Sequence, residues 1–328
     1  MPNKWPQRIA SFLIISLLGG ALATPAVAQR DAAAAFPSKT IRIVIPFPPA
    51  GLPDVIARMV APKMAESFGQ PVVVDNKAGA SGAIALEFVA KSPAEGHALA
   101  MITSGSLVLE DTPYDFARDF VAVSLLASNA YVVVINAKLP ARTLPELIAL
   151  AKTKPKVLTY GSSGTGGATH LAVAWLASLS GTEWTHVPYK GIAQAITDVA
   201  GGHVSMVMSS IQLWKTFAAS GQVIGVAVTS PKRQVSAPDL PSVQETGIAG
   251  YEIEGWYGIV APSAVSAPVI TKLNQEFVRI MQLPDIRQKL TLDGAEASGT
   301  TPAQFAAYLR SETAKWRRIG QAAGIGAK

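Results

Sequence analysis

Residues 157–179, VLTYGSSGTGGATHLAVAWLASL, join a short strand, a turn of small residues and the start of a helix. The run from Val157 is β-prone, and the Ala/Leu-rich run from Ala168 has good helix propensity. The first amides of a helix lack internal partners and lie at the positive end of the helix dipole. The intervening glycines, serines and threonine admit a ligand close to the backbone, which suits an anion. Taken alone, a tight connection with flexible glycines is an equally good interpretation.

The same plan occurs twice earlier in the chain. Residues 41–60 (IRIVIPFPPAGLPDVIARMV) and 72–89 (VVVDNKAGASGAIALEFV) also run from a strand through a turn of small residues into a helix. Ligands of open parallel sheets bind beyond the carboxyl ends of the strands. We therefore expect the three turns to face one cleft.

The order of elements predicts an α/β fold, because strands and helices alternate along the whole chain. A length of 328 residues favours two domains. We interpret the β-prone runs 131–136 and 252–260 as crossings between them. One expected lobe is residues 36–132 plus 256–328, and the other is residues 133–255. Two crossings make a hinge, so the cleft between the lobes can close on a ligand.

The composition is that of a folded protein, with 49% hydrophobic and 15% charged residues. The formal net charge is +6, but lysines and arginines are scattered, which argues against a nucleic-acid-binding face. This mild positive charge would help to attract an anionic ligand. The absence of cysteine excludes disulfides, thiolate metal sites and cysteine nucleophiles.

The N-terminus has the pattern of a secretory signal peptide. Lys4 and Arg8 precede an apolar run, and Ala26 and Ala28 provide the small residues of a cleavage site before Gln29. An uncleaved membrane anchor is the alternative, although the apolar run is short for a span. We expect a cut after Ala28 and a soluble, exported, periplasmic product.

The sequence lacks the motifs of several catalytic and nucleotide-binding sites. The hydrolase elbow G-x-S-x-G would need glycine where Thr165 stands, no Gly-Lys-Ser/Thr follows the turn, and Gly164–Gly166 lacks the third glycine of a dinucleotide fingerprint. The sequence does not exclude a pair of catalytic carboxylates. The four histidines are far apart in sequence, with no close metal-ligand pair: His97, His170, His186 and His203.

Single side chains near the turns allow two interpretations each. His170 is a ligand contact or a loop organiser, or else a satisfied, partly buried histidine that fixes the turn. Tyr189 and Phe47 form walls of the cleft or simply pack. Asp54 caps or charges the first turn of its helix, with a contact to ligand through water as the second choice.

Six motifs occur in order along the chain: residues 46–82 (PFPPAGLPDVIARMVAPKMAESFGQPVVVDNKAGASG), 158–172 (LTYGSSGTGGATHLA), 187–191 (VPYKG), 198–204 (DVAGGHV), 237–252 (APDLPSVQETGIAGYE) and 256–262 (WYGIVAP). This ordered set resembles the Bug/TctC family, the extracytoplasmic solute receptors of tripartite tricarboxylate transporters. The resemblance implies a two-lobed type II periplasmic-binding-protein fold, with a mainly parallel sheet flanked by helices in each lobe. It also implies a non-catalytic protein without cofactor or metal that captures a small carboxylate.

In this family, backbone amides and ordered water typically hold the carboxylate, rather than an arginine fork. The resemblance implies ligand-binding positions in both lobes: Phe47, Pro49, Ala50, Gly51, Asp54, Asn76, Gly79, Ser81, Gly82, Ser104, Ser106, Ser163, Gly164, Thr165, Gly166, His170, Tyr189 and Ser209.

The sequence departs from the family pattern in three places. Ala50 stands where the first loop usually has glycine, and because alanine tolerates positive φ poorly, we expect an altered loop. The region after Ser106 is shorter than usual. Ser205 and Ser209 replace aspartates that many relatives carry, which removes partners for an ammonium group. We therefore expect a plain organic acid as ligand rather than an amino acid.

The sequence favours a monomeric periplasmic receptor that closes on a di-, tri- or aromatic carboxylic acid and delivers it to membrane permease subunits, without binding nucleic acid. Two alternatives come from other classes. One is a sensor that passes the closed state to a signalling partner, and the other is a secreted enzyme that acts on a carboxylate. The identity of the acid depends on the shape of the pocket.

Overall fold

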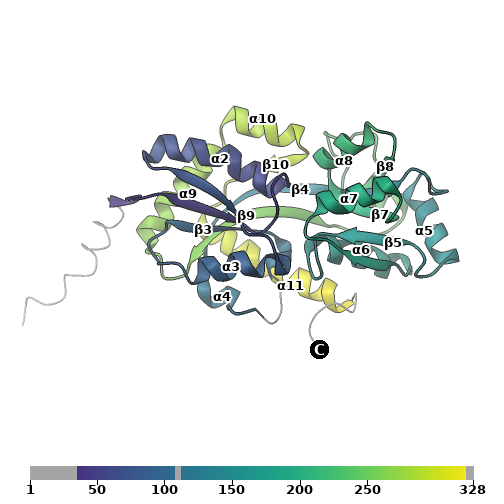
Figure 1. Cartoon of the computed structure of the whole chain (residues 1–328), viewed down its shortest axis with the longest axis horizontal. Helices are drawn as coiled ribbons and strands as arrows, with labels where there is room; N and C mark the ends of the chain where they lie inside the picture. The colour runs from purple at the N-terminus through teal and green to yellow at the C-terminus, as the bar shows by residue number, and fades with distance from the viewer. Residues whose placement is uncertain (1–34, 108–111, 323–328) are drawn as a thin grey trace, which may run out of the picture.

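The computed structural model, which describes residues 35–107 and 112–322, contains two sheets that share one long strand (Figure 1). In the first sheet, β1 (Ile41–Ile45) lies between β2 (Val72–Asn76) and β3 (Ala98–Ile102), and all three are parallel. Two antiparallel strands extend it, β9 (Glu254–Pro262) next to β3 and then β4 (Phe120–Asn136). The predicted recurrence of strand, turn and helix therefore produces neighbouring parallel strands.

The second sheet begins where β4 leaves the first. The C-terminal part of β4 pairs with β7 (Met206–Ser210) and with β8 (Val223–Val228). β5 (Thr159–Ser162) lies next to β7, and β6 (Thr185–Pro188) forms the edge of the sheet. β5 is parallel to both β7 and β6. The sequence predicts a β-prone crossing over residues 131–136, but the strand already forms at Phe120, because its first half pairs with β9.

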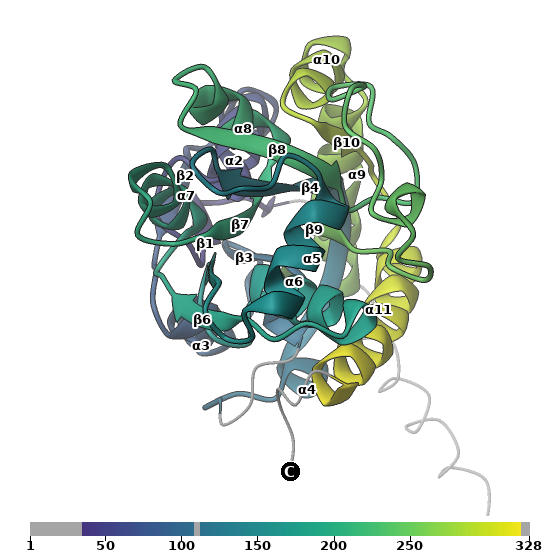
Figure 2. The same ribbon diagram turned by 90° about the vertical axis from the view of Figure 1, so that its right-hand side faces the viewer.

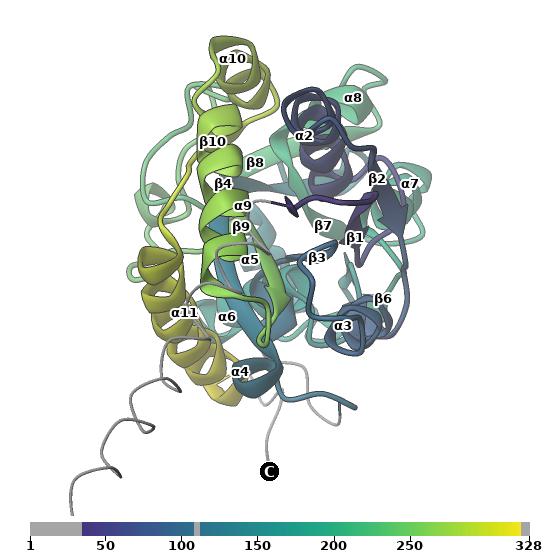
Figure 3. The same cartoon turned by 90° about the vertical axis from the view of Figure 1, so that its left-hand side faces the viewer.

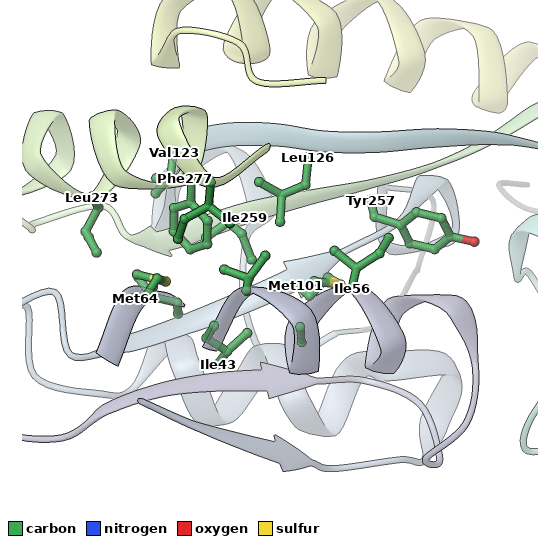
Figure 4. Packing of buried hydrophobic residues seen from close by; sticks show 14 of the residues in the cluster. Ile43, Ile56, Met64, Met101, Val123, Leu126, Tyr257, Ile259, Leu273 and Phe277 are labelled. Atoms are coloured by element: carbon green, nitrogen blue, oxygen red, sulfur yellow. The ribbon is translucent and has the colours of Figure 1, made fainter. Parts of the chain in front are cut away.

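Helices cover both faces of the first sheet (Figure 3). Helices α2 (Leu52–Phe68) and α9 (Ala267–Met281) bury their apolar side chains against one face, where Ile43, Ile259 and Phe277 meet (Figure 4). The opposite face is covered by α3 (Ala83–Ala90) and the first half of α11 (Pro302–Ala322). Three shorter elements complete this lobe: α4 (Phe116–Asp119), α10 (Pro284–Leu292) and β10 (Ala295–Ala297).

The second sheet is also covered on both faces (Figure 2). Helices α5 (Leu144–Thr153) and α6 (Ala168–Ser180) pack on one face, and α7 (Ile192–Gly201) and α8 (Ile211–Ala218) pack on the other. A capping box starts α5, because the Thr143 and Glu146 side chains each accept a backbone N–H of the other residue. Each lobe is therefore a sheet between two layers of helices.

Helix α11 joins the cores of the two lobes. Phe305 and Leu309, near its start, pack in the first lobe, whereas Trp316 and Ile319 pack in the core of the second. The two-lobed α/β fold is confirmed, while the numerical lobe boundaries stay a prediction. The expected cleavage site after Ala28 lies outside the described residues. Within the described part of the chain, no helix is both long enough and apolar enough to cross a membrane.

A buried carboxylate fixes α11 in this position. Oε2 of Glu312 accepts a hydrogen bond from the indole N–H of Trp256 on β9 and another from that of Trp316, each at 2.7 Å. Its Oε1 lies 2.6 Å from the Lys315 ammonium. Both tryptophans are fully buried, so this carboxylate satisfies two donors that have no access to water.

We predict that Glu312→Leu lowers the free energy of unfolding by about 2–4 kcal/mol, because it leaves two buried indole N–H groups unpaired. Urea unfolding followed by circular dichroism measures this loss. Arg317→Ala, an exposed change on the same helix, should stay within about 0.5 kcal/mol of the wild type. A Glu312→Leu variant as stable as the wild type would contradict this role of Glu312.

Candidate functional site

A cleft of about 100 Å³ lies between the two lobes. The first lobe contributes the loop before α2, the end of β3 and β9, and the second contributes the N-terminal ends of α6, α7 and α8. The shared strand β4 contributes Tyr131. The full lining is Phe47, Pro48, Pro49, Ala50, Gly51, Leu52, Pro53, Thr103, Gly105, Tyr131, Ser163, Gly167, Ala168, Thr169, Gly191, Ile192, Ala193, Met208, Ser210, Leu213 and Tyr257.

Four helices direct their N-termini at this cleft. The N-cap residues of α2, α6, α7 and α8 are Gly51, Gly167, Gly191 and Ser210, and all four line the cleft. The three glycines provide no side-chain cap, so the first helical amides behind them have no protein side chain as acceptor. These amides and the positive ends of the helix dipoles form an environment that favours an anion.

The helices differ in whether a protein side chain already interacts with their positive N-terminal end. In α2 the first turn carries the acidic side chain of Asp54, and in α8 the Ser210 hydroxyl accepts the N–H of Leu213 at 3.3 Å. In α6 and α7 the first turn has neither an acidic residue nor a side-chain cap. The N-termini of α6 and α7 are therefore the ones most available to an anionic ligand.

No charged side chain occurs among the described residues that line the cleft. An anion bound there would be stabilised by amides and dipoles rather than by arginine or lysine. The lining residues that the structure describes also include no carboxylate that could pair with a cation. In residues 35–107 and 112–322, no cluster of three histidine, aspartate or glutamate side chains is arranged to hold a metal ion.

Asp54 organises the loop that forms one wall of the cleft. Its carboxylate accepts the backbone N–H of Ala50 at 3.1 Å, the Arg58 guanidinium at 2.9 Å and the Asn76 amide at 3.0 Å. The Asn76 amide also donates to the carbonyl of Phe47 at 3.1 Å. The second recurring turn thus supports the first through Asn76.

Asp54 is only 3% exposed but stays ionised. Burial by itself would raise its pKa, but hydrogen bonds from Arg58, Asn76 and the Ala50 amide outweigh burial and hold this pKa below its usual value. A lowered pKa in the folded state means that Asp54 contributes stability at neutral pH and loses this contribution as the pH falls through that pKa.

Two stacked histidines hold the glycine-rich turn before α6. The rings of His170 and His186 are 3.8 Å apart and nearly parallel, with an interplanar angle of 7°. The N–H of Gly166 donates to Nδ1 of His170 at 2.9 Å, and the Ser162 hydroxyl lies 2.6 Å from Nε2 of His186. Burial and, secondarily, His186 lower the pKa of His170 to about 4, so Nδ1 remains a neutral acceptor. His170 is thus a loop organiser.

The predicted site residues fall into two groups. Five of them line the cleft: Phe47, Pro49, Ala50, Gly51 and Ser163. Twelve others lie outside the described lining, either beneath it or at neighbouring turns: Asp54, Asn76, Gly79, Gly82, Ser104, Ser106, Gly164, Thr165, Gly166, His170, Tyr189 and Ser209. The side chain of Ser81 is not among the parts of the chain that the structure describes. Their roles as ligand contacts stay a prediction.

Some residues of the second group have another partner, or none, in the structure. The Tyr189 hydroxyl donates to Asp198 at 2.6 Å, and Ser106 accepts the N–H of Thr103 at 3.3 Å. The hydroxyls of Ser104 and Ser209 are buried and have no hydrogen-bond partner. Ser205, one of the two serines at positions where the family pattern has aspartate, exchanges hydrogen bonds with Thr159 and does not line the cleft.

Sequence reasoning missed most of the second lobe's contribution and both tyrosines. Gly191 lies shortly after β6 and Ser210 is the last residue of β7, so the rule that ligands bind at strand ends would have pointed to both. Tyr131 and Tyr257 lie within strands and gave no local signal. Burial raises the pKa of both phenols, so they remain neutral and can donate to an anion.

The lobes touch at two places beside the cleft, where glycine is needed. A Cβ atom on Gly105 would lie 3.1 Å from the backbone nitrogen of Ala168 and 3.2 Å from Cα of Gly167. A Cβ atom on Gly191 would lie 3.3 Å from Cδ of Pro48. Glycine at these positions therefore permits close approach of the lobes.

Ala50 adopts the left-handed conformation, with a φ of 73°. Its N–H bond to Asp54 holds it there although alanine, unlike glycine, is strained at this φ. We predict that Ala50→Gly raises the free energy of unfolding by about 0.5–1 kcal/mol, measured by urea unfolding. Ala219→Gly, at an exposed helix end with φ of −58°, should destabilise instead. A loss of stability in Ala50→Gly would contradict the inferred strain.

Comparison with known proteins gives the family. The family model for the tripartite tricarboxylate transporter family receptor, TctC, matches residues 56–325. A UPF0065 protein in the tcbD-tcbE intergenic region of Pseudomonas sp. (strain P51) is 37% identical over 291 residues, which are 87% of this chain and 86% of that protein. Protein BugT of Bordetella pertussis is 29% identical over 317 residues, 95% of this chain and 97% of BugT.

Solved structures agree. R. palustris Rpa4515 with adipate is 32% identical, with a TM-score of 0.85 over 89% of this chain and 99% of that one. MatC from Rhodopseudomonas palustris with bound malate is 26% identical, with a TM-score of 0.82 over 87% and 99% of the two chains. The resemblance inferred from the ordered motifs is therefore confirmed, and the chain belongs to the TctC family of tripartite tricarboxylate transporter receptors.

Proposed function

We propose that this protein is a periplasmic receptor that captures a small organic carboxylate between its lobes and delivers it to the membrane subunits of a tripartite transporter. One observation carries the proposal. Glycine-capped N-termini of α6 and α7 open onto a cleft whose described lining contains no charged side chain. Such a site stabilises an anion through backbone donors, and the related structures with adipate and malate hold carboxylates.

The lining also supports a ligand without an ammonium group. The described lining residues include no carboxylate, and Asp54, which supports the loop before α2, is already paired with Ala50, Arg58 and Asn76. An ammonium group enclosed there would lose its hydration without gaining a counter-charge. This supports the expectation, drawn from Ser205 and Ser209, that plain acids are preferred to amino acids.

Export and transport are part of the same proposal. The expected signal peptide supports a mature chain outside the cytoplasm, and membership of a family of tripartite tricarboxylate transporter receptors supports a role in transport. Closure of the lobes is a population shift whose size equals the ligand's differential affinity for the closed form. The closed form would then be the state that membrane subunits recognise.

A thermal-shift screen of residues 29–328 tests carboxylate capture. The protein is unfolded and refolded first, to remove any ligand carried through purification, and then mixed with di-, tri- and aromatic carboxylic acids. An acid present at about 100 times its Kd should add about 2.7 kcal/mol to stability. The acid should be recovered chemically unchanged. If no carboxylate shifts the unfolding transition, the proposed function is wrong, and turnover of the acid would instead indicate an enzyme.

We predict that succinate binds at least about tenfold more tightly than aspartate, which differs from it by one ammonium group. The difference corresponds to about 1.4 kcal/mol, which is within the cost of enclosing an unpaired polar group. Isothermal titration calorimetry of both acids provides the ratio. Tighter binding of aspartate would show that the cleft contains a counter-charge for ammonium.

We predict that Gly105→Ala weakens binding of any carboxylate found in the screen by about tenfold or more. The added methyl group would crowd the amide of Ala168, at the start of α6, and push the lobes apart at this contact. Gly201→Ala, at the exposed end of α7, is the matched control and should bind normally. Unchanged affinity in Gly105→Ala would place the anion away from α6.

A further inference from the structure

Strand β4 changes its partner between two neighbouring residues. Up to Ala130, which lies opposite Glu254, it pairs with β9 of the first sheet. From Tyr131, which lies opposite Ser210, it pairs with β7 of the second sheet. Backbone rotation at this step would turn the second sheet against the first while both ladders keep their hydrogen bonds. The step from Ala130 to Tyr131 is therefore a hinge position in β4.

The side chain of Tyr131 reaches back across this step. The residue pairs within the second sheet, and it belongs to the core cluster on one face of that sheet. The end of its ring, however, lies over Gly255 of β9. A Cβ atom at position 255 would overlap the Tyr131 hydroxyl and would lie 2.7 Å from Cζ. Since Tyr131 also lines the cleft, one side chain connects the cleft, the second sheet and the first sheet.

The third connection between the lobes, α11, reaches the same place. The indole N–H of Trp256, the residue after Gly255, donates to Glu312 of α11 at 2.7 Å. Burial and, secondarily, the Glu312 carboxylate raise the pKa of the Tyr131 phenol, so the carboxylate is close enough to act on that hydroxyl. β4, β9 and α11 therefore come together around Tyr131 and Gly255.

Gly255 provides space rather than an unusual backbone conformation. It is not among the glycines with positive φ, so its backbone would accept other residues. Two side chains limit the space above it, Tyr131 and Asn129, whose Oδ1 would lie 2.6 Å from an added Cβ atom. Asn129 lies opposite Gly255 in the ladder of β4 and β9. When the second sheet turns, Asn129 therefore stays with Gly255, and Tyr131 is the neighbour that moves.

The position of Tyr131 over Gly255 belongs to a closed form, because the lobes touch in this structure at Gly105 with Gly167 and at Pro48 with Gly191. We propose that Gly255 is the seat of the Tyr131 ring in the closed form and that this contact is the pivot on which the lobes close. Gly255 is thus a positioning residue outside the described cleft lining. The inference rests on the lobe closure of the proposed function, but not on the identity of the ligand.

A methyl group at position 255 should act against the closed form in particular. In the closed form the methyl group and the Tyr131 ring compete for one space, whereas rotation of the second sheet carries the ring away. Overpacking of this kind is expected to lower the closed population by about tenfold or more relative to the open population. Gly255→Ala should therefore shift the lobes toward the open form.

Disulfide cross-linking measures closure without any ligand, because the chain has no cysteine of its own. Pro48→Cys and Gly191→Cys place a cysteine pair where a Cβ atom on Gly191 would lie 3.3 Å from Cδ of Pro48. The initial rate of disulfide formation in residues 29–328 under a mild oxidant follows the closed population. Adding Gly255→Ala to this pair should lower the rate by about tenfold or more.

Gly258→Ala on the same strand is the matched control. A Cβ atom there would crowd the ring of Phe305, at 2.7 Å from Cε1, inside the core of the first lobe. This variant is overpacked without touching the second sheet, so its cross-linking rate should equal that of the parent pair. Tyr131→Leu removes the ring atoms that the added methyl group meets. In that background Gly255→Ala should no longer lower the rate.

Every outcome decides the inference. Equal rates with and without Gly255→Ala would overturn it, and so would an equally large fall in the Tyr131→Leu background. A Gly255→Ala protein that fails to fold would show that the open form does not accommodate the methyl group either. A parent pair that never cross-links would show that the lobes do not close onto this contact. Both results would overturn the pivot and leave carboxylate capture to the thermal-shift screen.

Discussion

The convergence of helix N-termini on one cleft is the constraint on which the structure depends. The N-cap residues of α2, α6, α7 and α8 all line the cleft, and three of them are glycines without a side-chain cap. Unsatisfied amides at a helix start are normally paired with a side chain or water. Here two of the starts, at α6 and α7, remain open between the lobes. A bound anion would complete these helices, which links ligand binding to the local stability of the cleft.

Other parts of the molecule hold these helix starts in place without entering the cleft. Asp54 ties the Ala50 amide to Arg58 and Asn76, and it keeps its charge because these donors outweigh its burial. His170 accepts the Gly166 amide and thereby shapes the turn before α6. The lobes are joined by β4 and by α11, which Glu312 attaches to Trp256. Several polar residues near the site therefore hold its geometry, and the described cleft lining itself consists of backbone, apolar and hydroxyl groups without a charged side chain.

The alternation of strands and helices, the turn at Gly161–Gly167 and the capping box at Thr143 could be predicted, because each depends on residues close together in the sequence. Tyr131, Tyr257 and Leu213 could not, since their place in the cleft depends on how two sheets share β4 and how α8 packs. The altered loop expected at Ala50 stays a prediction, because it rests on the φ preference of alanine alone. The hydrogen bond to Asp54, four residues away, holds Ala50 at positive φ, and a local rule does not include that bond.

The most direct test of the account is to observe the backbone amides themselves. Backbone-assigned NMR spectra of ¹⁵N-labelled residues 29–328 would be followed during titration with a carboxylate that the protein binds. The account predicts that the largest amide proton shifts occur at Gly167–Thr169 and Gly191–Ala193, in the direction of stronger hydrogen bonding. The opposite result would be saturable shifts centred on surface lysines and arginines, with unchanged chemical shifts for the amides of Gly167–Thr169 and Gly191–Ala193. It would show that charged side chains bind the acid, and it would contradict recognition by helix N-termini.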